Sequence, residues 1–485
     1  MTELPARANG RTRLPWSGPS LGKARVQAAW RDAEPRPYWA DTVPLAEPTP
    51  ALQSRLDTDL VIIGGGFTGL WAALYAKEQQ PEREVALLES ETCGYGGSGR
   101  NGGFCFSSLT HTPENGMARF RGEMPTIERL GLENHAALLS DVEELGIDCE
   151  LERAAFLLVA VNGAQAEDFR SRVGLLRRLG HDAAVLGPEQ TRAEVASPLY
   201  QGAVSQRSGT ALLNPMKLVL GLRDVALSLG VRVFEHTPAT DIRDLGRTLR
   251  VYTPRGRVEA KKAVLATNAF PPLVRELRRY VLPVYDYVLT TEPLSPERLD
   301  SIGWNDRQAL EDAGNEFHYY RLTSDDRILW GGFGAVYGAR VNPSMEDRDE
   351  VFQKLAHNFF INFPQLEGVR FTHRWAGAID TCSRFSVFFG SAFDGRLRYA
   401  AGYTGLGVGA SRFGGRVALD LLDGRANEAG ELTLVRRKPI PFPPEPLRRA
   451  VIALTMNRLG AADRAGGRRG VWLRLLDRLG LGFQS

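Results

Sequence analysis

The stretch that decides the fold is residues 59–89, which read DLVIIGGGFTGLWAALYAKEQQPEREVALLE. Its first apolar run, residues 60–63, is short and rich in β-branched side chains, as expected of a strand buried on both faces of a parallel sheet. A glycine-rich turn follows, then a helix predicted from about residue 68 to residue 77, then a second strand over residues 85–88. This order predicts a βαβ unit of an α/β fold.

The glycines of this turn have the spacing of a dinucleotide-binding fingerprint. Gly64 is placed for a tight turn, Gly66 for backbone approach to a pyrophosphate, and Gly69 for close packing of the helix on the strand. The start of the helix would direct its free N–H groups and positive dipole end at that phosphate. Glu89 lies 20 residues after Gly69, where a carboxylate meets the adenosine ribose, and its charge disfavours NADP. The alternative is a glycine turn in another kind of α/β sheet.

The composition describes a folded protein of more than one domain. A chain of 485 residues exceeds one ordinary core, and 43% hydrophobic with 24% charged residues is usual for soluble globular proteins. No apolar run reaches the roughly 20 residues that span a bilayer. The basic N-terminus lacks the apolar segment and cleavage site of a secretory signal, so a cytoplasmic location is expected.

Cysteine and histidine usage argues against disulfides and metal sites. The 4 cysteines are scattered without a C-x-x-C pair, and the 7 histidines form no zinc-binding pattern. We therefore expect buried thiols and no metal centre.

Basic residues are concentrated in residues 436–485. This segment contains eleven basic and three acidic residues, which gives it a net charge of +8 and the rest of the chain a net charge of −5. No nucleic-acid motif accompanies them, so nucleic acid is not an expected partner.

A second glycine-rich stretch, SETCGYGGSGRNGGF, follows Glu89 directly over residues 90–104. One interpretation is a flexible surface loop. Its position after the ribose-binding strand and its side chains Ser98, Arg100 and Asn101 favour another. Glycines let the backbone pass close to a flat ligand, while a hydroxyl and a guanidinium can hold a pyrophosphate.

In the order GGGFTGL, LLE and GYGGSGRNGG, these motifs resemble the flavin-binding part of the D-amino-acid oxidase superfamily of FAD-dependent oxidoreductases. The resemblance is greatest to members similar to glycine oxidase, sarcosine oxidase and gamma-glutamylputrescine oxidoreductase. It continues at ALLNPMKLVLGL, KKAVLATNAFPP, FHYYRLTSDDRILWGG, RWAGAID and AAGYTGLGVGASRFGGRVALDLL, and covers roughly residues 57–423. It implies a Rossmann-type FAD-binding domain with a second, mostly antiparallel-sheet substrate domain.

We divide the chain on this basis. The predicted parts are an extended N-terminal arm (1–55), an FAD-binding domain (56–110, 200–275 and 370–435), a substrate domain (111–199 and 276–369) and a basic helical C-terminal extension (436–485). Hydrophobic patterning predicts strands over 156–161, 204–213, 231–234, 263–266, 280–291, 317–321 and 328–333, and helices over 164–179 and 215–229. Tyr38 and Trp39 are expected to anchor the arm on the body.

The resemblance also implies which residues hold the cofactor. Backbone near Pro238 and Ala239 would flank the adenine, and the segment from Tyr403 to Leu406 would lie at the pyrimidine edge of the flavin, where a helix N-terminus stabilises negative charge. The expected cofactor-binding residues are Gly64, Gly66, Phe67, Thr68, Gly69, Glu89, Ser90, Gly97, Ser98, Arg100, Asn101, Gly102, Gly103, Ala239, Thr267, Asn268, Gly402, Tyr403, Thr404, Gly405 and Leu406.

Two departures from related chains predict that the FAD is noncovalent. Some relatives attach the flavin through a cysteine near the RWAG segment, where this chain has Trp375 and Ala376. Others use a histidine in the glycine-rich loop, where this chain has Asn101.

The expected reaction is oxidation of a C–N bond in an amine or amino acid by hydride transfer to the flavin, followed by hydrolysis of the imine. Tyr320 and Arg321 are the candidate substrate-positioning residues, because a guanidinium can clamp a carboxylate in a bidentate manner. A structural salt bridge of Arg321 is the alternative. The electron acceptor is dioxygen or another acceptor, such as a quinone or carrier protein. A flavin-fold binding protein without redox activity is the non-enzymatic alternative.

The C-terminal extension predicts two basic amphipathic helices, over residues 447–459 and 471–479. Such helices fit a membrane surface, which would also supply a quinone. We favour the other interpretation, in which both helices pack on the acidic body and cover its apolar surface.

Overall fold

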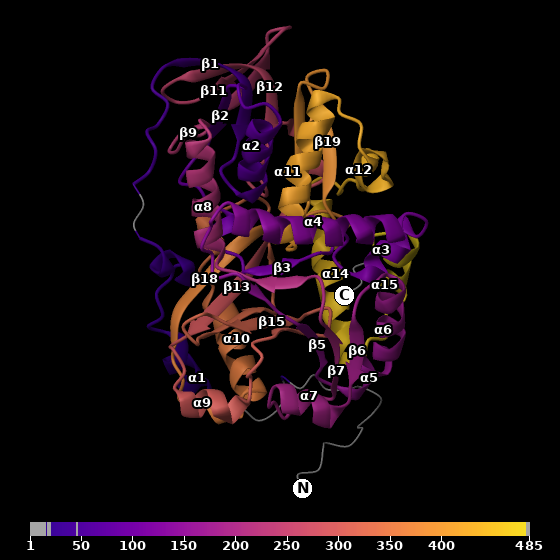
Figure 1. The fold of residues 1–485 in the computed structure, drawn as a ribbon. Helices are drawn as coiled ribbons and strands as arrows, with labels where there is room; N and C mark the ends of the chain where they lie inside the picture. Colours follow the sequence, from indigo (N-terminus) through magenta and orange to yellow (C-terminus); the bar gives the residue numbers. More distant parts are fainter. Residues whose placement is uncertain (1–15, 17–20, 45–46, 482–485) are drawn as a thin grey trace.

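The computed structural model describes residue 16 and residues 21–44 and 47–481. It contains an eight-stranded sheet, a nine-stranded sheet and a small sheet between them, and Figure 1 places the two large sheets at opposite ends of the molecule with helix α4 (Met124–Glu144) crossing between them. The predicted arm lies partly outside the described residues.

The eight-stranded sheet is built on the βαβ unit that the sequence predicts. Its strands are β1 (Arg55–Ile63), β2 (Val85–Leu88), β9 (Arg232–Phe234), β10 (Asp241–Asp244), β11 (Leu249–Tyr252), β12 (Arg257–Leu265), β19 (Phe388–Ala392) and β20 (Leu397–Ala401). The order β10-β11-β12-β1-β2-β9 is extended by β20, which pairs with β12, and by β19. β1 runs parallel to both β2 and β12.

Helices cover this sheet because each has an apolar face to bury. They are α2 (Phe67–Gln79), α8 (Pro215–Ser228) and α11 (Gly407–Asp423). Leu70 and Trp71 of α2 pack in one buried cluster with Leu60 and Ile62 of β1 and with Leu419 of α11. The helix α2 is therefore held against the strand whose carboxyl end forms the glycine turn.

The nine-stranded sheet is antiparallel apart from one strand pair. Its strands are β5 (Phe156–Ala160), β6 (Ala183–Leu186), β7 (Gly202–Gln206), β13 (Leu282–Thr291), β14 (Ala309–Asp312), β15 (His318–Leu322), β16 (Ile328–Gly332), β17 (Val336–Tyr337) and β18 (Phe371–Thr381). The order is β17-β13-β16-β15-β14-β5-β7-β6, with β18 paired to β13, and only β14 and β5 run parallel. The small sheet has the order β3-β8-β4, from β3 (Phe104–Phe106), β4 (Glu152–Arg153) and β8 (Thr210–Leu212).

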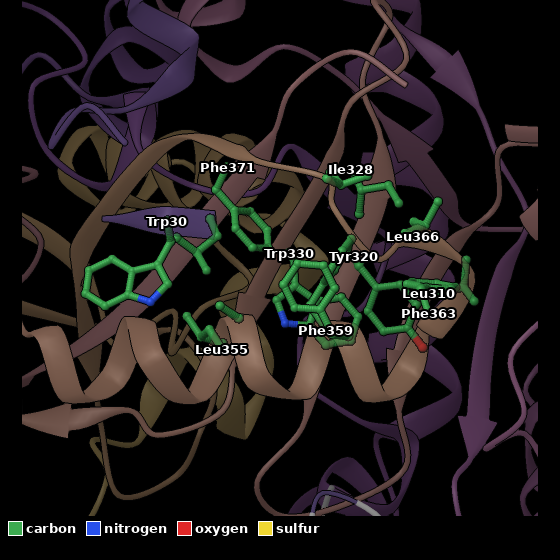
Figure 2. Packing of buried hydrophobic residues seen from close by; sticks show 14 of the residues in the cluster. Trp30, Leu310, Tyr320, Ile328, Trp330, Leu355, Phe359, Phe363, Leu366 and Phe371 are labelled. Carbon is green, nitrogen blue, oxygen red and sulfur yellow. The ribbon is translucent and has the colours of Figure 1, made fainter. Parts of the chain in front are cut away.

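One face of the nine-stranded sheet packs on helix α10 (Asp349–Asn362). Figure 2 shows Tyr320 and Trp330 of the sheet against Phe359 and Phe363 below them. Tyr320 and Trp330 have ring centroids 4.6 Å apart, and both are fully buried. This face is therefore a closed aromatic core, and only the opposite face can contribute to a cavity.

Smaller helices connect and cover these layers. They are α1 (Lys23–Trp30), α3 (Pro113–Phe120), α5 (Gly163–Glu167), α6 (Phe169–Arg178), α7 (Pro188–Glu194), α9 (Pro296–Ile302), α12 (Glu428–Glu431) and α13 (Thr433–Arg436). The C-terminal extension adds α14 (Leu447–Arg464) and α15 (Val471–Arg478).

The arm is not extended throughout, because residues 23–30 form helix α1. Val26 and Trp30 of α1 are buried against the nine-stranded sheet. After α1, Glu34 forms a parallel β-bridge with His373 of β18. The Glu34 N–H donates to the Thr372 carbonyl, and the Arg374 N–H donates to the Glu34 carbonyl. Tyr38 and Trp39 are buried, which confirms them as anchors of the arm.

The fold class and most elements agree with the sequence predictions. Two predicted elements are divided in the structure. The helix expected over residues 164–179 is two helices, α5 and α6, which meet at Asp168. The strand expected over 204–213 is β7 and β8, because a turn with Gly209 at a φ of +75° interrupts it.

The C-terminal helices pack on each other through Leu459, Ala462 and Leu473. Asp463 of α14 accepts hydrogen bonds from the backbone N–H groups of Asn315 and Glu316, which ties the extension to the loop before β15. The packing is incomplete, since Val471, Leu475 and Leu479 remain exposed.

Within the described ranges, no helix is both long and apolar enough to cross a bilayer. The same part of the chain contains no cluster of three His, Cys, Asp or Glu side chains suited to a metal ion. All 4 cysteines are buried free thiols, as their scatter predicts.

Candidate active site

A cavity of about 530 Å³ lies between the two large sheets. The eight-stranded sheet contributes the carboxyl ends of β1 and β2, and the nine-stranded sheet contributes the face opposite its aromatic core. The wall is completed by the glycine loop, which we define as residues 94–103, and by the start of α11.

The glycine turn after β1 leaves little room for a Cβ atom at three of its positions. Gly64 has a φ of +114°, and a Cβ on Gly69 would collide with the Gly64 carbonyl oxygen. A Cβ on Gly66 would lie 2.8 Å from the Ser98 hydroxyl oxygen, which accepts a hydrogen bond from the Phe67 N–H at 2.9 Å. The turn can therefore contain only glycine at these positions. It leaves the start of α2, which has no capping side chain, at the cavity.

Glu89 at the end of β2 has its carboxylate held in place. One oxygen accepts from the Gly65 N–H at 2.7 Å, and the other accepts from the Glu91 N–H at 3.0 Å and the Ser90 hydroxyl at 3.1 Å. These contacts orient the carboxylate at the cavity wall, where Glu89 lies.

The glycine loop is fixed from behind by two tryptophans. Trp39 of the arm donates its indole N–H to the Asn101 carbonyl, and Trp375 of β18 donates to the Arg100 carbonyl, each at 2.8 Å. The Arg100 guanidinium forms an ion pair with Glu346 at 2.7 Å and donates to the Ala376 carbonyl at 3.1 Å. The loop is therefore a supported wall rather than a flexible surface segment.

The segment before α11 forms a further part of the cavity wall. Asp380 of β18 accepts from the Gly402 N–H at 2.6 Å, and Thr404 and Gly405 follow with φ values of +52° and +91°. The Tyr403 hydroxyl lies 2.8 Å from the Thr68 hydroxyl, which joins this segment to α2. Burial raises the pKa of Asp380 to about 7, although four backbone N–H groups oppose the shift.

The structure brings most of the sequence-predicted site residues to this cavity. Those on its wall are Gly64, Gly66, Phe67, Thr68, Glu89, Ser90, Gly97, Ser98, Arg100, Asn101, Gly102, Ala239, Thr267, Asn268, Tyr403, Thr404, Gly405 and Leu406. Gly69, Gly103 and Gly402 lie behind it. A Cβ on Gly103 would collide with the Leu213 carbonyl oxygen, so this glycine permits close backbone packing.

Tyr320 and Arg321 do not line the cavity. Tyr320 points into the aromatic core, where its hydroxyl contacts Tyr200 at 2.7 Å and Asp312 at 3.3 Å (Figure 2). Arg321 is fully buried, and its guanidinium donates to the carbonyl oxygens of Leu213, at 2.9 Å, and Leu322, at 3.0 Å. This placement agrees with the structural alternative for Arg321, although the contacts are to backbone carbonyls rather than to a carboxylate.

The neighbouring residue, Tyr319, is the one that reaches the cavity. It donates its hydroxyl hydrogen to the carboxylate of Asp286 on β13, and its ring lies over Gly331 of the intervening strand β16. Burial raises the pKa of Asp286 to about 6 and that of the Tyr319 hydroxyl well above 10. Tyr319 is therefore protonated over the physiological range.

Glu311 and His111 complete this end of the cavity, and sequence reasoning did not single them out. Burial raises the pKa of Glu311 to about 7 and lowers the pKa of His111 to about 4. His111 is therefore neutral near pH 7. The available signal was the charge of two residues, since Asp286 interrupts the apolar run of β13 and Glu311 directly follows Ala309 and Leu310 of β14.

The comparison with protein families decides the identity of the fold. The model of the family described as FAD dependent oxidoreductase (DAO) matches residues 59–421. The chain belongs to this family. FAD is thus the cofactor of this oxidoreductase.

Individual relatives of this FAD-dependent oxidoreductase extend over most of its length. It is 32% identical over 411 residues to gamma-glutamylputrescine oxidoreductase of Escherichia coli (strain K12), covering 83% of this chain and 92% of the relative. Sarcosine oxidase subunit beta of Rhizobium meliloti (strain 1021) is 25% identical over 375 residues, covering 74% and 78%. The crystal structure of glycine oxidase from Geobacillus kaustophilus has the same fold, with a TM-score of 0.65, 20% identity and coverage of 79% and 99%.

Proposed function

We propose that this FAD-dependent oxidoreductase oxidises a C–N bond of an amine or amino acid. The observation that carries the proposal is a single cavity that joins the glycine turn and glycine loop to the Tyr319–Asp286 pair. The names of its relatives support this substrate class, since they include gamma-glutamylputrescine oxidoreductase, sarcosine oxidase subunit beta and glycine oxidase.

The residues present fit FAD. The N-cap residues of α2 and α11 provide no capping side chain. Apart from the Phe67 N–H, which donates to Ser98, the N–H groups at these helix starts would be available for the pyrophosphate and for the flavin, respectively. Glu89 would accept the ribose hydroxyl hydrogens, and the absence of a Cβ at Gly66 would admit the pyrophosphate. The division into FAD-binding and substrate domains is part of this proposal, with β7 and β18 assigned to the substrate domain because both lie in the nine-stranded sheet. A noncovalent flavin is also part of it.

The chemistry that bound FAD would supply is acceptance of a hydride, that is two electrons and one proton, from the carbon next to the substrate nitrogen. The substrate C–N bond becomes C=N, and addition of water splits it into a carbonyl compound and an amine or ammonia. The ammonium must first lose a proton, because only the neutral amine has the lone pair that supports hydride loss.

The Tyr319–Asp286 pair is suited to that proton. Asp286 lines the cavity, and with a raised pKa of about 6 its carboxylate is a better proton acceptor than an exposed aspartate. Tyr319 donates to this carboxylate and fixes its orientation. The pair would bind the substrate ammonium and receive its proton.

The experiment is a screen of amines, N-methyl amino acids and D- and L-amino acids with an artificial electron acceptor. We expect reduction of the acceptor with substrates of one of these classes, and a loss of at least tenfold in kcat/KM in the variants Tyr319→Phe and Asp286→Asn. Tyr285→Phe is the matched control, because the Tyr285 hydroxyl donates to the Asn342 carbonyl and this residue is not on the cavity wall. Repeating the assay with dioxygen alone separates an oxidase from a dehydrogenase. Protein that takes up no FAD, or oxidises none of these compounds, would overturn the proposal.

A further inference from the structure

Most of the charged side chains on the cavity wall already have a hydrogen-bond or ion-pair partner within the protein. Glu89 and Asp380 accept backbone N–H groups, and Asp286 accepts from Tyr319. Arg100 is paired with Glu346. These four side chains therefore have structural partners before any ligand arrives.

Glu311 is the exception. It lies on the cavity wall, and no described residue donates a hydrogen bond to its carboxylate or forms an ion pair with it. An enclosed carboxylate without a partner is costly, and such groups in native proteins call for an explanation. Because its carboxylate is reachable from the cavity, a ligand can supply the missing partner.

The surroundings of Glu311 suit a cation. Glu311 of β14 pairs in register with Tyr319 of β15, so their side chains share the cavity face of the sheet. The Phe104 ring meets Tyr319 edge to face at 5.5 Å and stacks on Phe106 at 6.0 Å. Aromatic faces beside a carboxylate attract an alkylammonium group, and the same faces can pack against the methylene chain that carries it.

The nearby positive charges do not neutralise Glu311. Arg172 of α6 lowers its pKa only in part, since burial still raises that pKa to about 7, and Arg172 is paired with Glu114 at 3.7 Å. His111 is neutral near pH 7 because burial lowers its pKa to about 4. Apart from Arg100, no lysine or arginine lines the described wall, so this end of the cavity offers a carboxylate ligand no free cation.

We propose that Glu311 binds a second cationic group of the substrate, so that the substrate is a diamine or polyamine rather than an amino acid. This inference rests on the proposed C–N oxidation at the same cavity. Val288, Gly331, Tyr319 and Glu311 lie in one row across β13, β16, β15 and β14. Three strand spacings of about 4.8 Å separate β13 from β14, so a substrate chain of several carbons is needed between the two ends.

The test compares three substrates of equal chain length at four, six and eight carbons. These are the α,ω-diamine, the 1-aminoalkane and the ω-amino acid, which place a cation, a methyl group or an anion at the far end. For the flavin-loaded wild-type protein we expect the KM of the diamine to be at least tenfold below that of the 1-aminoalkane at one or more lengths, with the ω-amino acid the poorest of the three.

Glu311→Gln should raise the diamine KM to that of the 1-aminoalkane and leave the kcat for the 1-aminoalkane unchanged. Glu311→Asp keeps the charge and should retain a preference for the diamine. Glu297→Gln, at an exposed position on α9, is the matched control. The diamine can also be titrated by its effect on the flavin absorbance of Asp286→Asn, in which turnover is slowed. Comparison with Asp286→Asn/Glu311→Gln then gives the effect of Glu311 on the dissociation constant, which should rise at least tenfold in the double variant.

Two failures can be told apart. If amines are oxidised but the diamine and the 1-aminoalkane have equal KM, or Glu311→Gln leaves the ratio unchanged, the second cation site is wrong and the C–N oxidation stands. If amino acids reduce the flavin but no amine of any length does, the second cation site is again wrong and the C–N oxidation stands. If neither amines nor amino acids reduce the flavin, the proposed function itself fails.

Discussion

Trp39 and Trp375 donate their indole N–H groups to the consecutive carbonyl oxygens of Asn101 and Arg100. One tryptophan belongs to the N-terminal arm and the other to β18, so two distant parts of the chain fix the glycine loop from behind. The loop can therefore be rigid although it contains six glycines between residues 94 and 103.

Removing either indole N–H should loosen the loop. Trp39→Phe and Trp375→Phe each lose one hydrogen bond worth about 1 kcal/mol, so we expect FAD affinity to fall roughly fivefold in each variant. Fluorescence titration of the apo-protein with FAD measures this. Trp304→Phe, a buried tryptophan outside the cavity wall, is the control. Wild-type affinity in both loop variants would show that the loop keeps its shape without these contacts.

Glu89→Ala should weaken FAD binding by about 1 to 3 kcal/mol, because it removes an oriented acceptor for the ribose and frees the Gly65 N–H. The matched control is Glu91→Ala, since Glu91 uses only its backbone N–H to contact Glu89. Equilibrium dialysis of both variants gives the comparison. An unchanged dissociation constant for Glu89→Ala would place the ribose elsewhere.

Arg321→Lys should impair amines and amino acids equally. The guanidinium donates to the Leu213 and Leu322 carbonyls, and a lysine can satisfy fewer of these acceptors in the same space. We expect a loss of stability of about 2 kcal/mol, seen as a lower Tm, with the ratio of kcat/KM values for the two substrate types unchanged. A selective loss for amino acids would instead support the carboxylate-clamp role predicted from the sequence.

Glu311 should make stability depend on pH. Burial raises its pKa from 4.5 to about 7, with Arg172 opposing the shift. The folded protein therefore holds this proton more tightly than the unfolded chain does, and the contribution of Glu311 to stability falls as the pH rises from about 4.5 to about 7. Relative to the wild type, Glu311→Gln should gain up to about 3 kcal/mol across this window. Thermal unfolding without substrate at pH 5 and pH 8 measures the change, and an equal difference in Tm at both pH values would contradict it.

Deleting residues 447–485 should reduce both solubility and FAD retention. Asp463 is the acceptor for the Asn315 and Glu316 N–H groups, and the loop that it holds leads into β15, which carries Tyr319. The single variant Asp463→Asn tests this contact without removing the helices, and we expect a smaller loss of FAD retention. A truncated protein that remains soluble and active, but no longer sediments with the anionic vesicles that bind the full-length chain, would favour the membrane-surface role.

The cofactor end of the cavity could be predicted because its determinants are local. The G-x-G-x-x-G spacing of Gly64, Gly66 and Gly69 marks the three positions at which the turn has no room for a Cβ. Glu89 follows after the number of residues that one βαβ unit requires. No long-range information is needed to recognise such a unit.

The substrate end could not be predicted in the same way. Tyr319, Tyr320 and Arg321 are consecutive, and the face of β15 that packs on α10 decides only that Tyr320 points away from the cavity. Tyr319 and Arg321 share the other face, but the Arg321 guanidinium donates to the Leu213 and Gly103 carbonyls instead of lining the cavity. Tyr320 belongs to the aromatic core in both its ring contacts and its hydroxyl contact with Tyr200. Asp286 and Glu311 lie near Tyr319 only because β13 and β14 flank β16 and β15 in the sheet. The sequence alone does not reveal this order of strands.

The bridge between Glu34 and His373 has a consequence for association between molecules. β18 pairs with β13 on one side only, so its other side would present unpaired N–H and C=O groups to any passing strand. The arm occupies this side through the Glu34 and Arg374 N–H groups. The stretch of this edge around His373 that the protein's own chain covers cannot pair with a strand of a second copy, so the arm shortens the edge that is open to edge-to-edge aggregation.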